Sequence, residues 1–109
     1  MIADEITKEI TKKENYVTVL HKKLNKQTNL KIKEATERAK LMSSNLTDKI
    51  EGKVTEKAKV AYCDKMLQKE TTELKWLEND ISKLKRQIEL CNDKIACYKY
   101  TIKEMEITK

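Results

Sequence analysis

The strongest constraint on the fold is a regular apolar pattern between Leu74 and Met105. Apolar residues recur there in alternating steps of three and four, which is the a/d spacing of a coiled coil. Leucine or isoleucine fills every a position. The pattern consists of Leu74, Leu77, Ile81, Leu84, Ile88, Cys91, Ile95, Tyr98, Ile102 and Met105. It predicts a long helix that buries this stripe against a second helix.

The composition agrees with an all-α fold. The 109 residues include no proline and one glycine, and 39% of them are charged. Such a chain has few residues for turns and many that favour long helices, which predicts a single domain. The net charge is +6, but opposite charges alternate along most of the chain, as on a solvated helix surface. Because the longest apolar run is four residues, we expect a cytoplasmic protein without a membrane span.

The first half of the chain has a helical pattern of its own. Apolar residues recur mostly in steps of three or four, at Ile2, Ile6, Ile10, Val17, Leu20, Leu24, Ile32, Ala35, Ala39, Met42 and Leu46, with Thr28 filling one step. Gly52 can end this helix in a left-handed conformation, and Thr55 can cap the next one. The expected elements are a helix over about 3–50, a turn over about 51–55 and a helix over about 55–108.

A second interpretation of the reversal stays open. The first helix can instead end at Ser43, with Asn45 and Asp48 forming a capping box and a short helical piece preceding Gly52. In both interpretations the chain folds back near its midpoint.

The helices are expected to pair within one chain and antiparallel. The alternative is a parallel pairing of residues 67–105 with a second copy. That pairing would place Glu73 beside Glu78 and Lys94 beside Lys99, and both contacts are repulsive. The predicted fold is therefore a long antiparallel helical hairpin.

Apolar residues outside the main stripe suggest a protein interface. On the second helix they share the c position of the heptad, and on the first helix they lie roughly opposite the predicted inner stripe. The candidate interface residues are Tyr62, Trp76, Leu90, Val19, Leu30 and Leu41. They predict that hairpins associate into a multi-helix bundle, most simply a homodimer, although scattered surface apolar residues are also common.

Residues that could support catalysis or metal binding are sparse. Cys63, Cys91 and Cys97 all fall on the second helix, where the spacing rules out a disulfide between any two of them if that helix is continuous. Cys63 and Cys91 occupy d positions as small apolar residues. No cysteine pair or histidine cluster has the spacing of a zinc site, and His21 is the only histidine. We therefore expect no enzyme activity, no cofactor and no metal.

A lysine stripe on the first helix offers a second function. Lys12, Lys22, Lys26, Lys33 and Lys40 lie on one side of a helical wheel, together with Lys8. Such a stripe can follow the phosphates of a nucleic acid, but it is also the ordinary solvated face of a helix.

The runs Ala35–Lys40 and Glu51–Lys57 and the Ile- and Leu-spaced tail ending near Tyr98 resemble small helical-hairpin proteins of phages and mobile elements of low-GC Gram-positive bacteria. The resemblance implies an accessory or host-takeover role in the host cytoplasm. The first hypothesis is a coiled-coil module that binds an unidentified protein and itself. The alternative is a nucleic-acid-binding accessory protein of replication or recombination that uses the lysine stripe.

Overall fold

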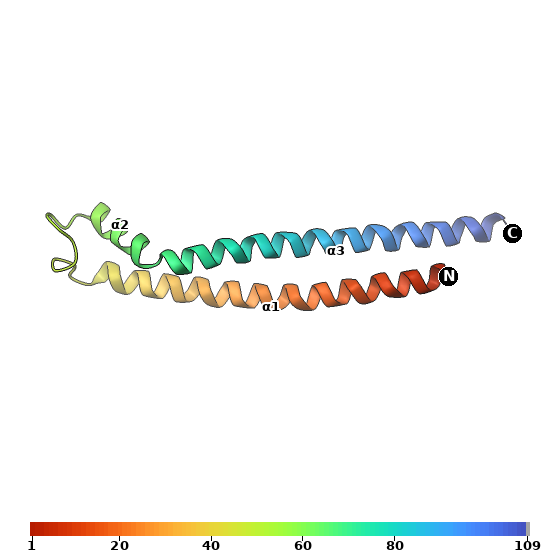
Figure 1. Cartoon of the computed structure of the whole chain (residues 1–109), viewed down its shortest axis with the longest axis horizontal. Helices are drawn as coiled ribbons and strands as arrows, with labels where there is room; N and C mark the ends of the chain where they lie inside the picture. Colours follow the sequence, from red (N-terminus) through yellow and green to blue (C-terminus); the bar gives the residue numbers. More distant parts are fainter. Residues whose placement is uncertain (109) are drawn as a thin grey trace. The chain divides into compact units, whose positions relative to one another are not determined.

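The chain is an all-α antiparallel helical hairpin, as the heptad pattern predicts. A computed structural model describes residues 1–108, and the described part contains three helices. These are α1 (Ile2–Ser43), α2 (Glu56–Met66) and α3 (Gln68–Thr108) (Figure 1). The packing forms two compact units: unit 1 (Met1–Leu24 with Asn79–Lys109) and unit 2 (Asn25–Glu78).

Unit 1 pairs the first part of α1 with the last part of α3. The direction is fixed by two cross-helix ion pairs, Lys23 with Asp80 at 3.4 Å and Glu9 with Lys94 at 3.9 Å. Because the residue number rises along one helix as it falls along the other, the two segments are antiparallel. On the α3 side of the core, Ile81 and Cys91 are buried. The predicted stripe is buried or half-buried from Ile81 to Ile102 in this unit, and Met105 is exposed.

Unit 2 packs the last part of α1 against α2 and the start of α3. Its buried apolar residues are Leu46, Cys63, Leu67 and Leu77. Arg38 on α1 is bonded to Asp64 on α2 at 2.8 Å, which ties these two helices together.

The reversal follows the second interpretation in part. α1 ends at Ser43 and not near residue 50. The hydroxyls of Ser43 and Ser44 donate to the carbonyls of Lys40 and Leu41 at 3.1 and 2.9 Å, so side chains take over acceptors that the next helical turn would use. The Asn45 side chain accepts from the N–H of Thr47 at 3.1 Å, so the predicted capping box with Asp48 is wrong.

The rest of the loop contains two of the predicted signals. Ile50 N–H donates to the Leu46 carbonyl at 2.9 Å, which closes one helical turn before Gly52. Gly52 has φ 79°, the left-handed conformation expected of it, but within the loop and not at the end of a helix. Thr55 caps α2, because its side chain accepts from the N–H of Ala58 at 3.1 Å.

The predicted second helix is interrupted at Leu67, which separates α2 from α3. Leu67 has φ −103° and ψ 15°, outside the helical region. Its carbonyl accepts both the N–H and the hydroxyl of Thr71, each at 3.0 Å. Five other threonine hydroxyls bond the carbonyl four residues back within uninterrupted helix, so this bond alone does not account for the interruption. Leu67 itself fits an a position of the heptad, but the next d position holds Glu70, so the apolar pattern is broken just after the interruption.

The inner face of α1 differs from the predicted one in unit 2. Leu30 and Leu41, which we expected on the outer side, are half-buried, whereas Ile32 is 61% exposed and Ala35 and Ala39 are also exposed. Leucine buries more apolar area than alanine, so turning the two leucines inward stabilises this unit more.

Candidate protein-interaction surfaces

The structure separates the six candidate interface residues into two groups. Leu30, Leu41 and Tyr62 are half-buried, so they contribute to packing within unit 2. Trp76, Leu90 and Val19 are exposed to 66%, 51% and 42%. Only this second group offers open apolar surface to another molecule.

Trp76 lies on the outer side of α3 in unit 2. It borders a shallow groove of about 470 Å³ with Gln68, Lys69, Thr72 and Glu73, all from the same helix. A large aromatic ring in a polar rim is a typical anchor of protein interfaces, because it supplies apolar area with little loss of side-chain freedom.

Val19 and Leu90 are brought onto one face of unit 1. Two adjoining grooves between α1 and α3, of about 200 and 250 Å³, share Gln87 as a lining residue. We call this surface the basic groove. It is lined by Lys12, Tyr16, Val19 and Lys23 from α1 and by Lys83, Gln87, Leu90 and Lys94 from α3. Its middle is mainly apolar, and lysines stand at both ends.

Acidic side chains neutralise part of the basic groove. The Glu9 side chain is buried, and its Oε1 lies 3.6 Å from Lys12 Nζ and 3.9 Å from Lys94 Nζ. At the other end Asp80 pairs with Lys23 at 3.4 Å, and Lys83 forms no ion pair within the described part of the chain. Each end therefore holds two lysines and one carboxylate, which leaves one excess positive charge.

Cys91 lies beneath the first of these ends. Burial raises the pKa of its thiol, and a hydrogen bond to Glu9 raises that pKa further. Cys91 therefore stays protonated and unreactive, which agrees with its predicted place in the core. All three cysteines are free, and Cys97 is exposed.

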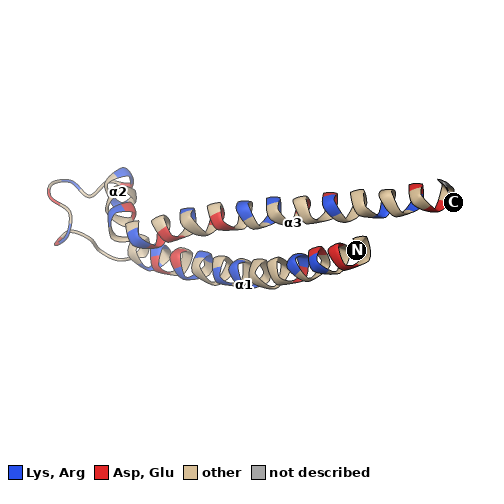
Figure 2. Cartoon of the chain, turned by 45° about the vertical axis from the view of Figure 1, so that its right-hand side comes forward, with Lys and Arg blue, Asp and Glu red and all other residues tan. Residues whose placement is uncertain are grey.

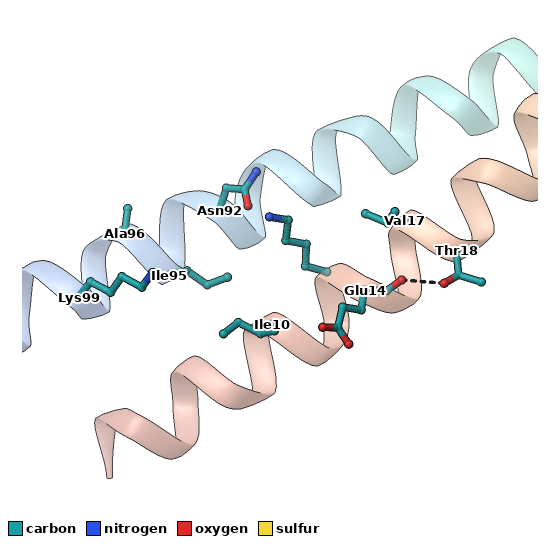
Figure 3. Close-up of a pocket in the computed structure, with 9 residues that line it drawn as sticks. Ile10, Glu14, Val17, Thr18, Asn92, Ile95, Ala96 and Lys99 are labelled. Carbon is teal, nitrogen blue, oxygen red and sulfur yellow. Dashed lines mark hydrogen bonds between the residues drawn. The ribbon is translucent and has the colours of Figure 1, made fainter.

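A wider groove of about 690 Å³ also runs between the helices of unit 1. Ile10, Val17 and Ile95 point into it, and Glu14 and Thr18 lie toward its outer side (Figure 3). The Thr18 hydroxyl donates to the Glu14 carbonyl at 3.0 Å and so bonds to its own helix. This groove has a mixed polar rim and one lysine on each helix, Lys13 and Lys99.

The predicted lysine stripe is exposed along α1. Lys12, Lys22, Lys26, Lys33 and Lys40 are all open to solvent. Lys12 is engaged by Glu9. Ribbon segments of basic and acidic residues are interspersed along α3 and near the two ends of α1 (Figure 2). Between Glu14 and Glu34 the sequence of α1 has no acidic residue, so Lys22, Lys26 and Lys33 present a positive potential to phosphates.

Two further expectations concern metals and membranes. Within the described residues, no group of three or more His, Cys, Asp or Glu side chains could hold a metal ion, and His21 is exposed. In the same part of the chain, none of the helices combines the length and apolar character needed to cross a bilayer.

Comparison with known proteins adds no family. No family model, curated protein or solved structure matches the chain.

Sequence reasoning missed the basic groove as a unit. Lys12 and Lys23 are eleven residues apart, as are Lys83 and Lys94, with apolar or amide side chains between them at the fourth and seventh positions. This spacing is visible in the sequence. The alignment of α1 with α3, which brings the two lysine pairs together, cannot be read from the sequence.

Proposed function

We propose that the protein is a non-enzymatic interaction module that binds another protein through apolar side chains on the outside of its hairpin. The observation that carries the proposal is Trp76, the only tryptophan, which is 66% exposed on an ordered helix. An aromatic ring held in this way loses little freedom on binding and buries a large apolar area.

The amount of exposed surface supports association. The chain exposes 8646 Å². A compact monomer of 12.8 kDa exposes about 6,300 Å² by the usual scaling of area with mass. Packing against further helices would cover part of this excess, so we include self-association in the proposal. By its sequence resemblance, we further propose an accessory role in a phage or mobile element.

The proposal is tested by affinity capture from the organism that encodes the chain, using the natural sequence and Trp76→Ser side by side. We expect a defined protein to be captured by the natural chain and lost with Trp76→Ser. Addition of that purified protein should shift the Trp76 fluorescence to shorter wavelength as the ring leaves water. A partner captured equally by both chains, without a fluorescence shift, would contradict the role of Trp76.

The second candidate is nucleic-acid binding along the lysine stripe, which is favoured by the exposure of Lys22, Lys26 and Lys33. Its signature is steep salt dependence, with a log–log slope of about 0.7 to 0.9 per neutralised phosphate. A mobility shift with single- and double-stranded DNA, repeated with Lys22, Lys26 and Lys33 changed to Gln, decides it. If the triple variant binds DNA as well as its parent, the stripe is not a nucleic-acid site.

A further inference from the structure

The two helices that form the basic groove of unit 1 contribute the same series of side-chain types. On each helix a lysine is followed by two uncharged side chains and a second lysine, at steps of four, three and four. The series are Lys12, Tyr16, Val19, Lys23 on α1 and, in the opposite chain direction, Lys94, Leu90, Gln87, Lys83 on α3. At 1.5 Å per residue the two lysines of each series are about 16 Å apart. An occupant of the groove therefore meets positive charge at two ends and uncharged surface between them.

The acids at the groove ends balance only part of this charge. Glu9 lies near both Lys12 and Lys94, and Lys83 forms no ion pair within the described part of the chain. Each end keeps one excess positive charge. Because Lys12, Lys83 and Lys94 are exposed, their ammonium groups can reach a carboxylate that lies above the groove.

The uncharged middle of the groove distinguishes a protein ligand from a nucleic acid. Each strand of duplex DNA carries one phosphate per about 3.4 Å of helix axis, so it would place about five phosphates along the distance between the two lysines. The inner ones would lie over Tyr16, Val19 and Leu90, which offer them no cation. A ligand with negative charge at two points and apolar groups between them fits the groove better.

We propose that the basic groove binds an amphipathic helix of a partner protein. This helix carries two acidic residues eleven residues apart, with apolar residues at the fourth and seventh positions after the first acid. The acids face the lysines at the two ends, and the apolar residues cover Tyr16, Val19 and Leu90. A third helix against a pair of helices is ordinary bundle packing. The proposal rests on the proposed interaction role and names the chemistry of one partner.

A synthetic peptide tests the proposal with the purified chain. The probe is a fluorescein-labelled helical peptide with two glutamates and two leucines in this pattern on an alanine- and glutamine-rich background. The steps of four, three and four read the same in both directions, so the probe fits whichever way it lies. By fluorescence anisotropy, we expect the natural chain to bind it about tenfold more tightly than matched peptides with glutamine for glutamate or serine for leucine.

Charge reversal of the groove should weaken this binding. Lys83→Glu with Lys94→Glu should raise the Kd of the probe by at least about tenfold, because like charges then face each other. The same variant should bind a peptide with lysines in place of the two glutamates, which shows that it is folded. Lys85→Glu with Lys99→Glu is the matched control: it makes the same charge change at exposed positions on the opposite side of α3 and should alter the Kd by less than about threefold.

The apolar part of the contact has its own variant. Leu90 is 51% exposed in the groove, so Leu90→Ser removes apolar contact area and leaves every ion pair in place. It should raise the Kd of the probe by about fivefold. Circular dichroism checks that the variant is helical.

Four outcomes overturn the proposal. They are no binding of the probe, equal binding of the glutamate and glutamine peptides, equal weakening by the two double charge reversals, and binding that Leu90→Ser leaves unchanged. Displacement of the probe by single-stranded DNA at a lower concentration than by unlabelled peptide would assign the groove to a nucleic acid instead. Trp76→Ser should bind the probe as the natural chain does, so failure here is distinguishable from failure of the proposed function.

Discussion

Arg38 bonds one carboxylate on each of two helices in unit 2. Its Nε lies 2.8 Å from Glu34 on α1, and its guanidinium also lies 2.8 Å from Asp64 on α2. The hydrogen bond to Glu34, followed by the one to Asp64, raises the pKa of the guanidinium. Arg38 therefore stays charged at any pH at which the protein folds, and the link between α1 and α2 depends on the two acids.

Replacement of Arg38 tests that link. Arg38→Ala should lower the free energy of unfolding by about 1 kcal/mol, because the side chain is part-exposed and its ion pairs are partly screened. Arg86→Ala is the matched control, since Arg86 is exposed and is the only other arginine; it should change stability by less than about 0.5 kcal/mol. Urea unfolding followed by circular dichroism measures both. Equal losses would mean that the bridge contributes nothing specific.

The Cys91 thiol gives a prediction about pH. Its pKa is higher in the folded chain than in the unfolded chain, because it is buried and bonded to Glu9. The resulting stabilisation is complete below the ordinary thiol pKa of about 8.5 and is lost as the pH rises through the folded value. Above about pH 8.5, the free energy of unfolding should therefore fall more steeply with pH in the natural chain than in Cys91→Ala. Melting temperatures across this range compare the slopes, and parallel curves would contradict the prediction.

At the scale of helices, α3 was predictable and α1 was only partly so. Large apolar residues at nearly every a and d position left α3 one way to face its partner. On α1, Ile32, Ala35 and Ala39 compete with Leu30 and Leu41, and both sets have helical spacing. The choice depends on the area that each set buries against the other helix, which a single helix does not reveal.

Two substitutions on α1 distinguish these faces. Leu30→Lys should destabilise unit 2 by about 1 to 2 kcal/mol, because it removes half-buried apolar area and brings a charge to the inner side. Ile32→Lys, two residues away and 61% exposed, should change stability by less than about 0.5 kcal/mol. If the inner face predicted from sequence were the correct one, Ile32→Lys would destabilise the protein more than Leu30→Lys. Thermal unfolding of the two variants decides between them.

The same limit applies to the candidate surfaces. The exposure of Trp76 and Leu90 followed from their c positions on α3. The meeting of Val19 with Leu90, and of the lysine pairs at the groove ends, depends on the alignment of α1 with α3. That alignment is set by contacts such as Lys23 with Asp80, whose partners are 57 residues apart in the chain.

For the molecule as a whole, the segment between Ser43 and Glu56 is the longest stretch outside the helices. It holds two exposed lysines, Lys49 and Lys53. Trypsin cannot easily bind a helical backbone, so among the 24 Lys and Arg residues these two should be cut first. Mass spectrometry of early fragments identifies the site.

The interruption at Leu67 is the other place where trypsin could cut first. First cleavage at Lys65 or Lys69 would mean that the region between α2 and α3 opens more readily than the loop. Changing Lys49 and Lys53 to Gln should delay digestion of the whole chain if the loop is the first site.

The first residues of α1 lie beside residues 102–106 of α3 in unit 1. Met1, Ile2 and Ala3 line one groove with Ile102, Met105 and Glu106. Joining the ends by a short glycine–serine linker would therefore require little rearrangement, and new ends could be opened between Thr47 and Lys53. Such a circular permutant keeps every contact between the helices and changes only which connection is covalent, so the order in which the helices are synthesised is separable from the way they pair.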